Sequence, residues 1–263
     1  MPGKKTALGA RIAAALAVVA TLSLALTGCS ADPLTPADAR SRTDLDGDGK
    51  SGKPEARTGS VDCRQARCIA LTFDAGPGKD TPRLLDILKE KKVPATFFLL
   101  GRNHVLKHPD IVSRMAREGH EVGNHTWTHK RLTDLDADGI REELSRTQDA
   151  IQEITGDVPT VMRPPQGRTD DQVSEVSRDL GLAQILWSAT AKDYATTDPA
   201  LIERRILDAA DRDGIILLHD IYAGTVPAVP RIIDELKKRG YTFVTVPQLL
   251  APGVPEPGAV YRP

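Results

Sequence analysis

The chain has 263 residues, of which 27% are charged, yet its formal net charge is only −1. This balance gives no electrostatic reason to expect a nucleic-acid partner, and we expect none. The chain has three cysteines, Cys29, Cys63 and Cys68.

The amino-terminal segment has the features of an export signal. Lys4 and Arg11 belong to a basic start, and residues 12–26 form an uncharged apolar stretch. This stretch is short for a membrane-spanning helix but suits the core of a signal peptide. It ends in LTGCS, which resembles a bacterial lipobox with Cys29 as the lipidated residue. We predict a lipoprotein signal peptide over residues 1–28 and a lipid anchor on Cys29 at the outer face of the cytoplasmic membrane. The alternatives are secretion by an ordinary signal peptide and, less favoured, a retained membrane-spanning anchor.

The next segment, residues 29–60, is rich in Pro, Gly, Ser and charged residues and poor in apolar ones. It cannot bury a core, so we predict a flexible tether. Within residues 44–55, the acidic positions match the spacing of an EF-hand calcium loop. No amphipathic helix flanks this loop, and Pro54 adjoins its last ligand. We therefore predict a solvated acidic linker, with weak Ca²⁺ binding as the alternative.

Two cysteines precede the first strong strand pattern. Cys63 and Cys68 lie in VDCRQARC, and an exported compartment permits a disulfide between them. A metal-binding pair is the alternative, but this spacing without a second cluster is weak evidence for zinc. We predict the disulfide.

Residues 61–250 alternate between apolar or β-branched runs and segments with helical periodicity. In TPRLLDILKEKK, for example, Leu84 and Leu88 share one face. The alternation predicts a parallel sheet covered by helices, as a doubly wound sheet or a (β/α) barrel. No G-x-G-x-x-G follows the first strand, which disfavours dinucleotide binding, and residues 251–263 read as a loose tail. The expected strands are 69–74, 95–100, 121–126, 160–164, 183–188, 214–219 and 241–246.

Ionisable residues stand at the ends of most of these strands. The carboxyl ends of parallel strands meet at one edge of a sheet, so we expect their side chains to converge there. The residues are Asp74, His125, His129, Arg163, Asp193, His219 and Asp220.

The histidine pair points to a metal. His125 and His129 are four residues apart, and on a helical turn both imidazoles would project from one face toward a single ion. Two histidines and a carboxylate make an open zinc site, where the metal activates a water. Asp74 would take the proton of that water, and His219 would protonate the leaving group. The alternatives are a helix-capping role for Asp74 and a structural role for His219.

The other ionisable residues have simpler interpretations. Arg163 is expected to form a buried pair with Asp193 that also stabilises the charged form of Asp74, the alternative being a plain ion pair. The remaining histidines are expected at the surface: His104, His108 and His120.

In this order, TFDAGP, HTWTH, RPPQG, AKDY and LLHD resemble the motifs of the NodB-homology polysaccharide deacetylases, carbohydrate esterase family 4. The resemblance covers about residues 68–250. It implies a distorted (β/α) barrel of about seven parallel strands. It also implies removal of acetyl groups from N-acetylated or O-acetylated sugars with a divalent metal, Zn²⁺ or Co²⁺ above all.

The resemblance carries roles over to the matching positions. Asp74 matches the catalytic base, His219 the general acid, and His125 and His129 the metal pair. The other matches are Arg163 and Asp193 as residues that orient the base, Leu217 and Tyr194 as walls of the acetyl pocket, and Gln166, whose backbone N–H would face the developing oxyanion.

Some positions depart from the family pattern. The first motif usually has a second Asp, the third metal ligand, where this chain has Ala75. A methyl group cannot bind a metal, so the departure predicts weaker metal binding. Gln166, Thr190 and Tyr194 also differ from the usual residues, and the changes at Gln166 and Tyr194 are expected to alter the walls of the sugar groove but not the reaction.

These features predict a metal-dependent deacetylase of cell-wall or extracellular polysaccharide, with a NodB-type domain over residues 61–250. The simplest reaction is de-N-acetylation of peptidoglycan or chitin-like amino sugars. The alternatives are an acetylxylan O-deacetylase, a catalytically degenerate glycan-binding lipoprotein and a calcium-responsive surface lipoprotein. No pattern indicates an oligomer interface, and we expect a monomer.

Overall fold

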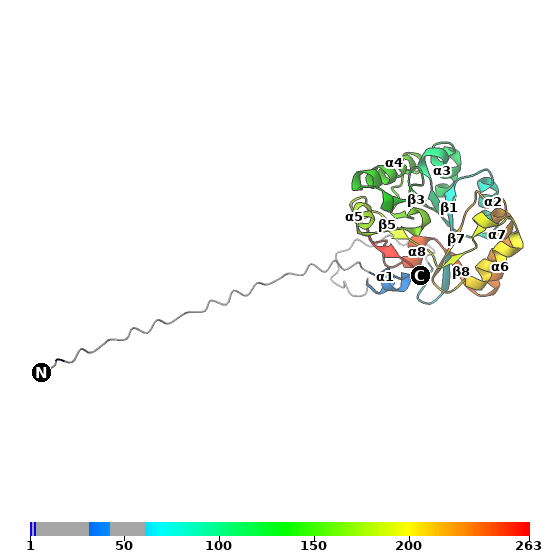
Figure 1. Cartoon of the computed structure of the whole chain (residues 1–263). Coiled ribbons are helices and arrows are strands. Elements are labelled where there is room, and N and C mark those ends of the chain that lie inside the picture. The colour runs from blue at the N-terminus through cyan, green and yellow to red at the C-terminus, as the bar shows by residue number, and fades with distance from the viewer. Residues whose placement is uncertain (2, 4–31, 43–60) are drawn as a thin grey trace. The chain divides into compact units, whose positions relative to one another are not determined.

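The computed structural model describes residues 1, 3, 32–42 and 61–263, and the described residues from Asp32 onward belong to one compact unit (Figure 1). Cys29, most of the predicted signal peptide and the predicted calcium-like loop lie outside the described residues.

Within the described residues, nine strands form one sheet in which every neighbouring pair is parallel. The order is β6-β7-β1-β2-β3-β4-β5-β9, and β8 pairs with β1 beside this path. The predicted α/β fold with a distorted barrel of parallel strands is confirmed, and a strand lies in each of the seven predicted runs (Figure 1). The strands are β1 (Arg67–Gly76), β2 (Thr96–Leu99), β3 (Glu121–Asn124), β4 (Val161–Met162), β5 (Ala183–Ile185), β6 (Ala189–Thr190), β7 (Gly214–Leu218), β8 (Tyr241–Val244) and β9 (Val260–Tyr261).

Strand β1 is the centre of this sheet. It pairs with β8 in its first half, with β7 in its middle and with β2 in its last part. Every residue of β1 after Arg67 is buried, as expected for a strand covered on both faces. The register with β2 shifts between Asp74 and Gly76, so the regular ladder ends where the first polar motif begins.

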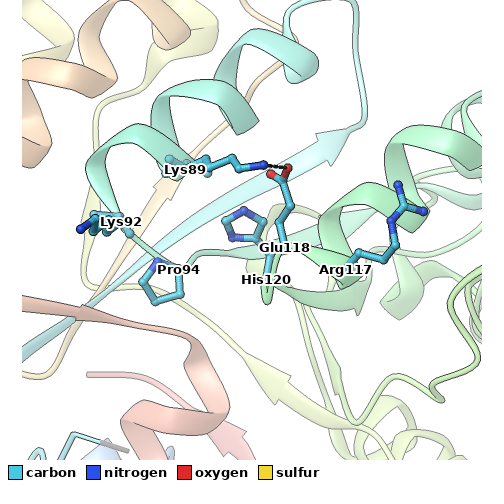
Figure 2. Close-up of a pocket in the computed structure, with 8 residues that line it drawn as sticks. Lys89, Lys92, Pro94, Arg117, Glu118 and His120 are labelled. Atoms are coloured by element: carbon cyan, nitrogen blue, oxygen red, sulfur yellow. Dashed lines mark hydrogen bonds and ion pairs between the residues drawn. The ribbon is translucent and has the colours of Figure 1, made fainter. Parts of the chain in front are cut away.

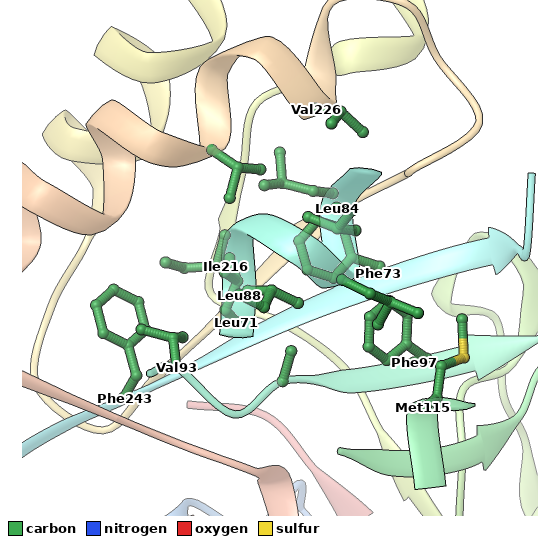
Figure 3. Packing of buried hydrophobic residues seen from close by; sticks show 14 of the residues in the cluster. Leu71, Phe73, Leu84, Leu88, Val93, Phe97, Met115, Ile216, Val226 and Phe243 are labelled. Atoms are coloured by element: carbon green, nitrogen blue, oxygen red, sulfur yellow. The ribbon is translucent and has the colours of Figure 1, made fainter. Parts of the chain in front are cut away.

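Amphipathic helices pack around the sheet, and Leu84 and Leu88 are buried as their spacing predicts (Figure 3). In the same core the rings of Phe73 and Phe97 stack with centroids 5.3 Å apart. Across the described residues, no helix has both the length and the apolar character needed to span a membrane. The helices around the barrel are α2 (Thr81–Lys91), α3 (Pro109–Arg117), α4 (Ala137–Thr155), α5 (Asp171–Asp179), α6 (Pro199–Ala209), α7 (Thr225–Lys238) and α8 (Val246–Leu250).

The predictions of a continuous tether and a loose tail are wrong in part. Within the predicted tether, helix α1 (Pro36–Arg42) packs on the domain. The Arg40 guanidinium donates to the carbonyl of Leu249 at 2.7 Å and pairs with Asp213 at 2.6 Å. Leu34 forms a β-bridge to Tyr261, which lies in β9 of the predicted tail. Composition missed these contacts because a few buried side chains suffice to hold a short segment against an existing core.

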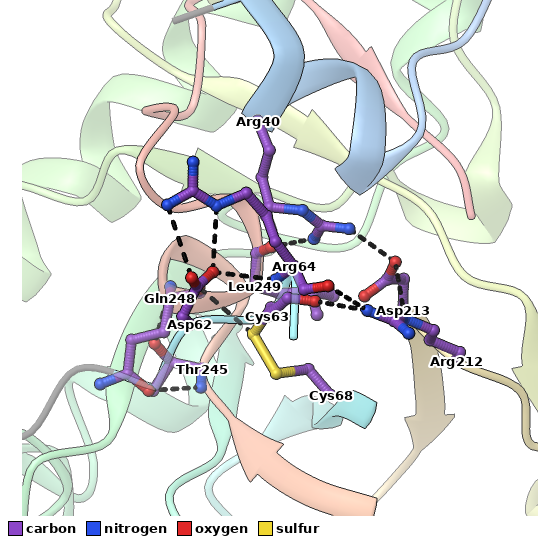
Figure 4. Close-up of a disulfide and its surroundings, with 10 residues drawn as sticks. All are labelled: Arg40, Asp62, Cys63, Arg64, Cys68, Arg212, Asp213, Thr245, Gln248 and Leu249. Atoms are coloured by element: carbon purple, nitrogen blue, oxygen red, sulfur yellow. Dashed lines mark hydrogen bonds and ion pairs between the residues drawn. A yellow bond between two sulfur atoms is a disulfide. The ribbon is translucent and has the colours of Figure 1, made fainter. Parts of the chain in front are cut away.

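The predicted disulfide is present. Cys63 and Cys68 are joined with an S–S distance of 2.10 Å and are both fully buried (Figure 4). The carbonyl of Cys63 also accepts a hydrogen bond from Arg212 at 3.0 Å. These contacts fix the segment that leads into β1. This segment lies at the start of the strand, at the opposite end from Asp74.

Candidate active site

The predicted polar residues do converge at the carboxyl ends of the strands. Asp74 lies near the end of β1, His125 follows β3, Arg163 follows β4 and His219 follows β7. Asp193 begins the short helical turn after β6. The contacts among these residues divide them into one buried pair, one partly buried pair and a histidine loop.

The first pair joins Asp74 and Arg163. Arg163 Nη1 donates to Asp74 Oδ1 at 2.7 Å and to Thr72 Oγ1 at 2.7 Å. Its other nitrogens donate to the carbonyls of Ile185 at 2.9 Å and Leu186 at 3.3 Å. Arg163 is fully buried and Asp74 is 3% exposed, so the guanidinium both holds the carboxylate in place and balances its charge.

The second pair joins His219 and Asp193, which corrects the predicted Arg163–Asp193 pair. His219 Nδ1 lies 2.9 Å from Asp193 Oδ1, and the backbone N–H of His219 donates to Asp193 Oδ2 at 2.7 Å. Thr225 Oγ1 donates to the same oxygen at 2.7 Å. Asp193 therefore orients the imidazole of His219, and it does not orient the Asp74–Arg163 pair.

This contact also changes the acid–base properties of His219. Burial lowers the pKa of the imidazole, but the hydrogen bond to Asp193 and the charges of Asp74 and Asp193 together raise it above its usual value. A histidine whose Nδ1–H is held by a carboxylate has Nε2 left for proton exchange. The pair is thus suited to donate a proton near neutral pH.

His125 and His129 lie side by side, with ring centroids 4.9 Å apart, but not on the predicted helical turn. They belong to a loop after β3 in which Thr126 and His129 have positive φ values of 74° and 63°. His125 Nδ1 lies 2.8 Å from the carbonyl of Arg163, which can only accept, so Nδ1 carries the proton. The lone pair of Nε2 then faces Asp74 Oδ2 at 3.9 Å.

Both imidazoles are suited to metal binding. Burial lowers the pKa of His125 to about 4 and also lowers the pKa of His129, so both rings are neutral at physiological pH. Two neutral imidazoles, one oriented by a backbone carbonyl, fit a divalent ion such as Zn²⁺. The third protein ligand is not found: among the described residues, no group of three or more His, Cys, Asp or Glu is arranged to hold a metal.

Ala75 is the position at which the sequence resemblance leads us to expect a third ligand. It is 7% exposed and has a φ of 63°, a left-handed conformation that costs most L-residues about 1–2 kcal/mol. Asp and Asn tolerate this conformation better than Ala does. The backbone at this position therefore has a conformation that Asp or Asn would tolerate better, while the side chain is only a methyl group.

Two of the predicted pocket residues, Leu217 and Tyr194, lie next to the second pair. Leu217 is 6% exposed and lies two residues before His219, and the ring of Tyr194 packs edge-on to that imidazole at 6.3 Å. Gln166 is exposed, has a φ of 60°, and its side chain accepts a hydrogen bond from Arg131 at 3.2 Å. All three lie on loops or strand ends at the same edge of the sheet.

Several site residues carry no sequence signal of their own. Thr72 and Thr225 donate to or accept from members of the two pairs, and the ring of Tyr222 lies 5.3 Å from His219. Threonines are too common in strands and turns to be singled out from sequence. Their roles follow from the tertiary contacts of each threonine, Thr72 with Arg163 and Thr225 with Asp193.

Asp220 was noted in the sequence without a role. It is fully buried, accepts a hydrogen bond from Thr81 Oγ1, and its Oδ1 has no partner within the part of the chain described. Burial raises its pKa to about 6. The carboxylate lies so close to Gly76 that a Cβ there would collide with it. Asp220 thus packs against the turn that follows Asp74.

A cavity of about 430 Å³ lies elsewhere, beside the residues that lead into β2 and β3 (Figure 2). His120 lines it and is 8% exposed, so the prediction that this histidine lies at the surface is wrong. Its Nδ1 accepts the N–H of Ala95 at 3.1 Å, and burial lowers its pKa to about 4. None of the converging strand-end residues lines this cavity, which excludes it as the site described above.

The comparisons with known proteins decide the family. Residues 62–185 match the model of a family described as "polysaccharide deacetylase". The solved structure of a deacetylase with substrate is 42% identical, with a TM-score of 0.73, and covers 76% of this chain and 99% of that one. The chain belongs to the polysaccharide deacetylase family. The resemblance found in the sequence motifs is therefore confirmed.

Two further relatives bear on activity. The peptidoglycan-N-acetylglucosamine deacetylase PgdA of Listeria monocytogenes is 40% identical over 182 residues, which are 69% of this chain. The chain spans only 38% of that relative's length. A mutant of a CE4-family pseudoenzyme with restored enzymatic activity is 31% identical, with a TM-score of 0.67, covering 71% of this chain and 68% of that one.

Proposed function

We propose that this protein is a metal-dependent deacetylase that removes N-acetyl groups from amino sugars of peptidoglycan or a related glycan. The observation that carries the proposal is the pairing of Asp74 with Arg163 beside His125 Nε2, with the His219–Asp193 pair at the same edge of the sheet. The relatives named as peptidoglycan deacetylases support this substrate class.

In the proposed reaction a water attacks the acetyl carbonyl, the C–N bond breaks, and acetate and a free amine are formed. His125 and His129 would hold Zn²⁺ or Co²⁺, which when bound polarises the carbonyl and the attacking water. Asp74 accepts the proton of the water, in a position fixed by Arg163. His219 protonates the leaving nitrogen through Nε2, while Asp193 holds its Nδ1–H.

The surrounding residues would select the acetyl group. Leu217 supplies an apolar surface against which the methyl group of the acetyl can pack. Tyr194, which is 59% exposed, can pack against the sugar. The backbone N–H of Gln166 is the proposed donor to the oxyanion, a role that needs only a main-chain group. Lipidation of Cys29 would keep the domain beside the cell wall outside the cytoplasmic membrane.

A second candidate is a glycan-binding protein that does not turn over its substrate. Ala75 in place of a third ligand favours it, together with the absence of a three-residue metal group among the described residues. A metal held by two protein ligands would be bound weakly, and occupancy would then limit activity.

One experiment separates the two candidates. The purified full chain is assayed for acetate release from peptidoglycan, chitotetraose and acetylxylan with Zn²⁺ or Co²⁺, beside an Asp74→Asn control. We expect release from the N-acetylated glycans that the control abolishes. Release by Ala75→Asp but not by the natural chain would support the degenerate protein, and release from acetylxylan alone would support an O-deacetylase.

A further inference from the structure

A pocket of about 370 Å³ lies beside the histidine loop and is not used by the proposed reaction. Its size falls at the lower end of the range for small-molecule sites. Trp127, Thr128 and Lys130 form one wall, and these residues alternate along the chain with the metal-binding candidates His125 and His129. The pocket and the candidate active site therefore share this loop as a common wall.

Buried contacts make that wall rigid. Glu143, which is 5% exposed, accepts the N–H of Thr128 at 2.8 Å and its hydroxyl at 2.5 Å. The backbone N–H of Arg102 donates to the carbonyl of Trp127 at 3.0 Å. Trp127 is 9% exposed, and the Arg146 guanidinium lies 4.4 Å from the centre of its ring. A ligand would thus meet a preformed surface rather than a loop that must first be ordered.

The charges of the pocket leave one cation without a partner. Arg146 pairs with Glu142 at 2.9 Å, and Lys130 lies 3.8 Å from Glu143. The guanidinium of Arg102 lines the pocket and is exposed, and within the described part of the chain it makes no hydrogen bond or ion pair. The lining thus has a surplus of one positive charge, carried by a planar group suited to a carboxylate.

We propose that this pocket is a subsite for a carboxylate-bearing substituent of the glycan, recognised by Arg102. The inference rests on the proposed function, because the shared loop would then present an acetylated sugar to the active site and its neighbour to the pocket. Trp127 supplies apolar surface in the lining, and the surplus positive charge is that of Arg102. The subsite would favour glycans with acidic sugars over neutral chitin-like chains.

The test compares two soluble tetrasaccharides of equal length: chitotetraose, and a tetrasaccharide of alternating N-acetylglucosamine and N-acetylmuramic acid. The wild-type full chain is compared with Arg102→Gln and with Arg204→Gln, a control at an exposed arginine of α6 that likewise has no partner among the described residues. We expect Arg102→Gln to raise KM for the acidic tetrasaccharide about tenfold, the effect of one charge-assisted hydrogen bond, and to leave kcat unchanged. The KM and kcat of Arg102→Gln for chitotetraose should equal those of wild type. The control variant should match wild type with both substrates.

A binding measurement keeps the inference independent of turnover. Calorimetry compares the acidic tetrasaccharide with its methyl ester, which lacks the negative charge. Esterification should weaken binding to wild type about as much as Arg102→Gln does, and should have no further effect on that variant. The inference is overturned if esterification weakens binding of the tetrasaccharide to wild type and to Arg102→Gln equally. If no glycan is deacetylated but this pattern holds, the proposed function fails and the subsite stands.

Discussion

The Asp74 carboxylate and the Arg163 guanidinium meet at 2.7 Å, with side chains 4% and 0% exposed. Neither group has water to solvate it, so each depends on the other. Burying a charge without its partner costs far more than the pair itself contributes. The pair is therefore a structural requirement of the domain as well as the centre of the proposed chemistry.

Replacing Arg163 should accordingly destabilise the fold. For Arg163→Met we expect a loss of about 3–5 kcal/mol in the free energy of unfolding, since Asp74 keeps a buried charge without a partner. Urea unfolding measures this loss. Adding Asp74→Asn should restore part of the stability by removing that charge. The matched control is Arg141→Met, whose exposed pair with Asp179 should contribute less than about 1 kcal/mol. Equal effects of the two single variants would contradict the prediction.

The contact between Asp193 and His219 should appear in the pH dependence of the reaction. Asp193 raises the pKa of His219, so the imidazolium persists to higher pH. A general acid is active when protonated, so its loss of a proton sets the alkaline limb of kcat. In Asp193→Asn this limb should move to lower pH and kcat should fall by about 10²-fold. Asp198→Asn, a helix-capping change in the same loop region, is the control. An unmoved limb would mean that another group is the acid.

Restoring a carboxylate at Ala75 should strengthen metal binding. For Ala75→Asp we expect Zn²⁺ affinity to rise by at least about tenfold, because a third protein ligand is added at a position whose backbone already suits Asp. Ala75→Asn tolerates the same left-handed conformation without the charge, so it separates relief of strain from ligation. Competition with a chromogenic chelator measures the affinity. Unchanged affinity in Ala75→Asp would show that another group already fills the position.

Asp220 should make stability depend on pH. Its folded pKa of about 6 lies above the ordinary value of 3.8, so the native state binds this proton more tightly than the unfolded state does. The contribution of Asp220 to stability is thus present at low pH and is lost as the pH rises from about 4 to about 6. Between pH 4 and 7, Asp220→Asn should gain up to about 3 kcal/mol relative to wild type.

Thermal or urea unfolding of both proteins across this range tests the difference. The exposed Asp208→Asn on α6 is the control and should track wild type at every pH. A constant difference between wild type and Asp220→Asn would show that Asp220 is ionised in both states.

Much of the fold could be predicted because burial leaves a periodic record in the sequence. The apolar runs of the seven predicted strands and the spacing of Leu84 and Leu88 reflect which faces are covered. Helix α1 and strand β9 left no such record. Each is held by a few contacts with residues distant in the chain, such as Arg40 with Asp213 and Leu34 with Tyr261.

The sequence was sufficient to identify the family, the strand-end residues and the unusual Ala75, because each is a matter of residue type and order. Only the tertiary structure decided which groups touch. It paired Arg163 with Asp74 rather than Asp193, and it brought His125 to His129 through a strained loop rather than a helix. Partners of this kind are chosen by the register and curvature of a sheet whose strands come from distant parts of the chain, and spacing along the sequence does not encode that geometry.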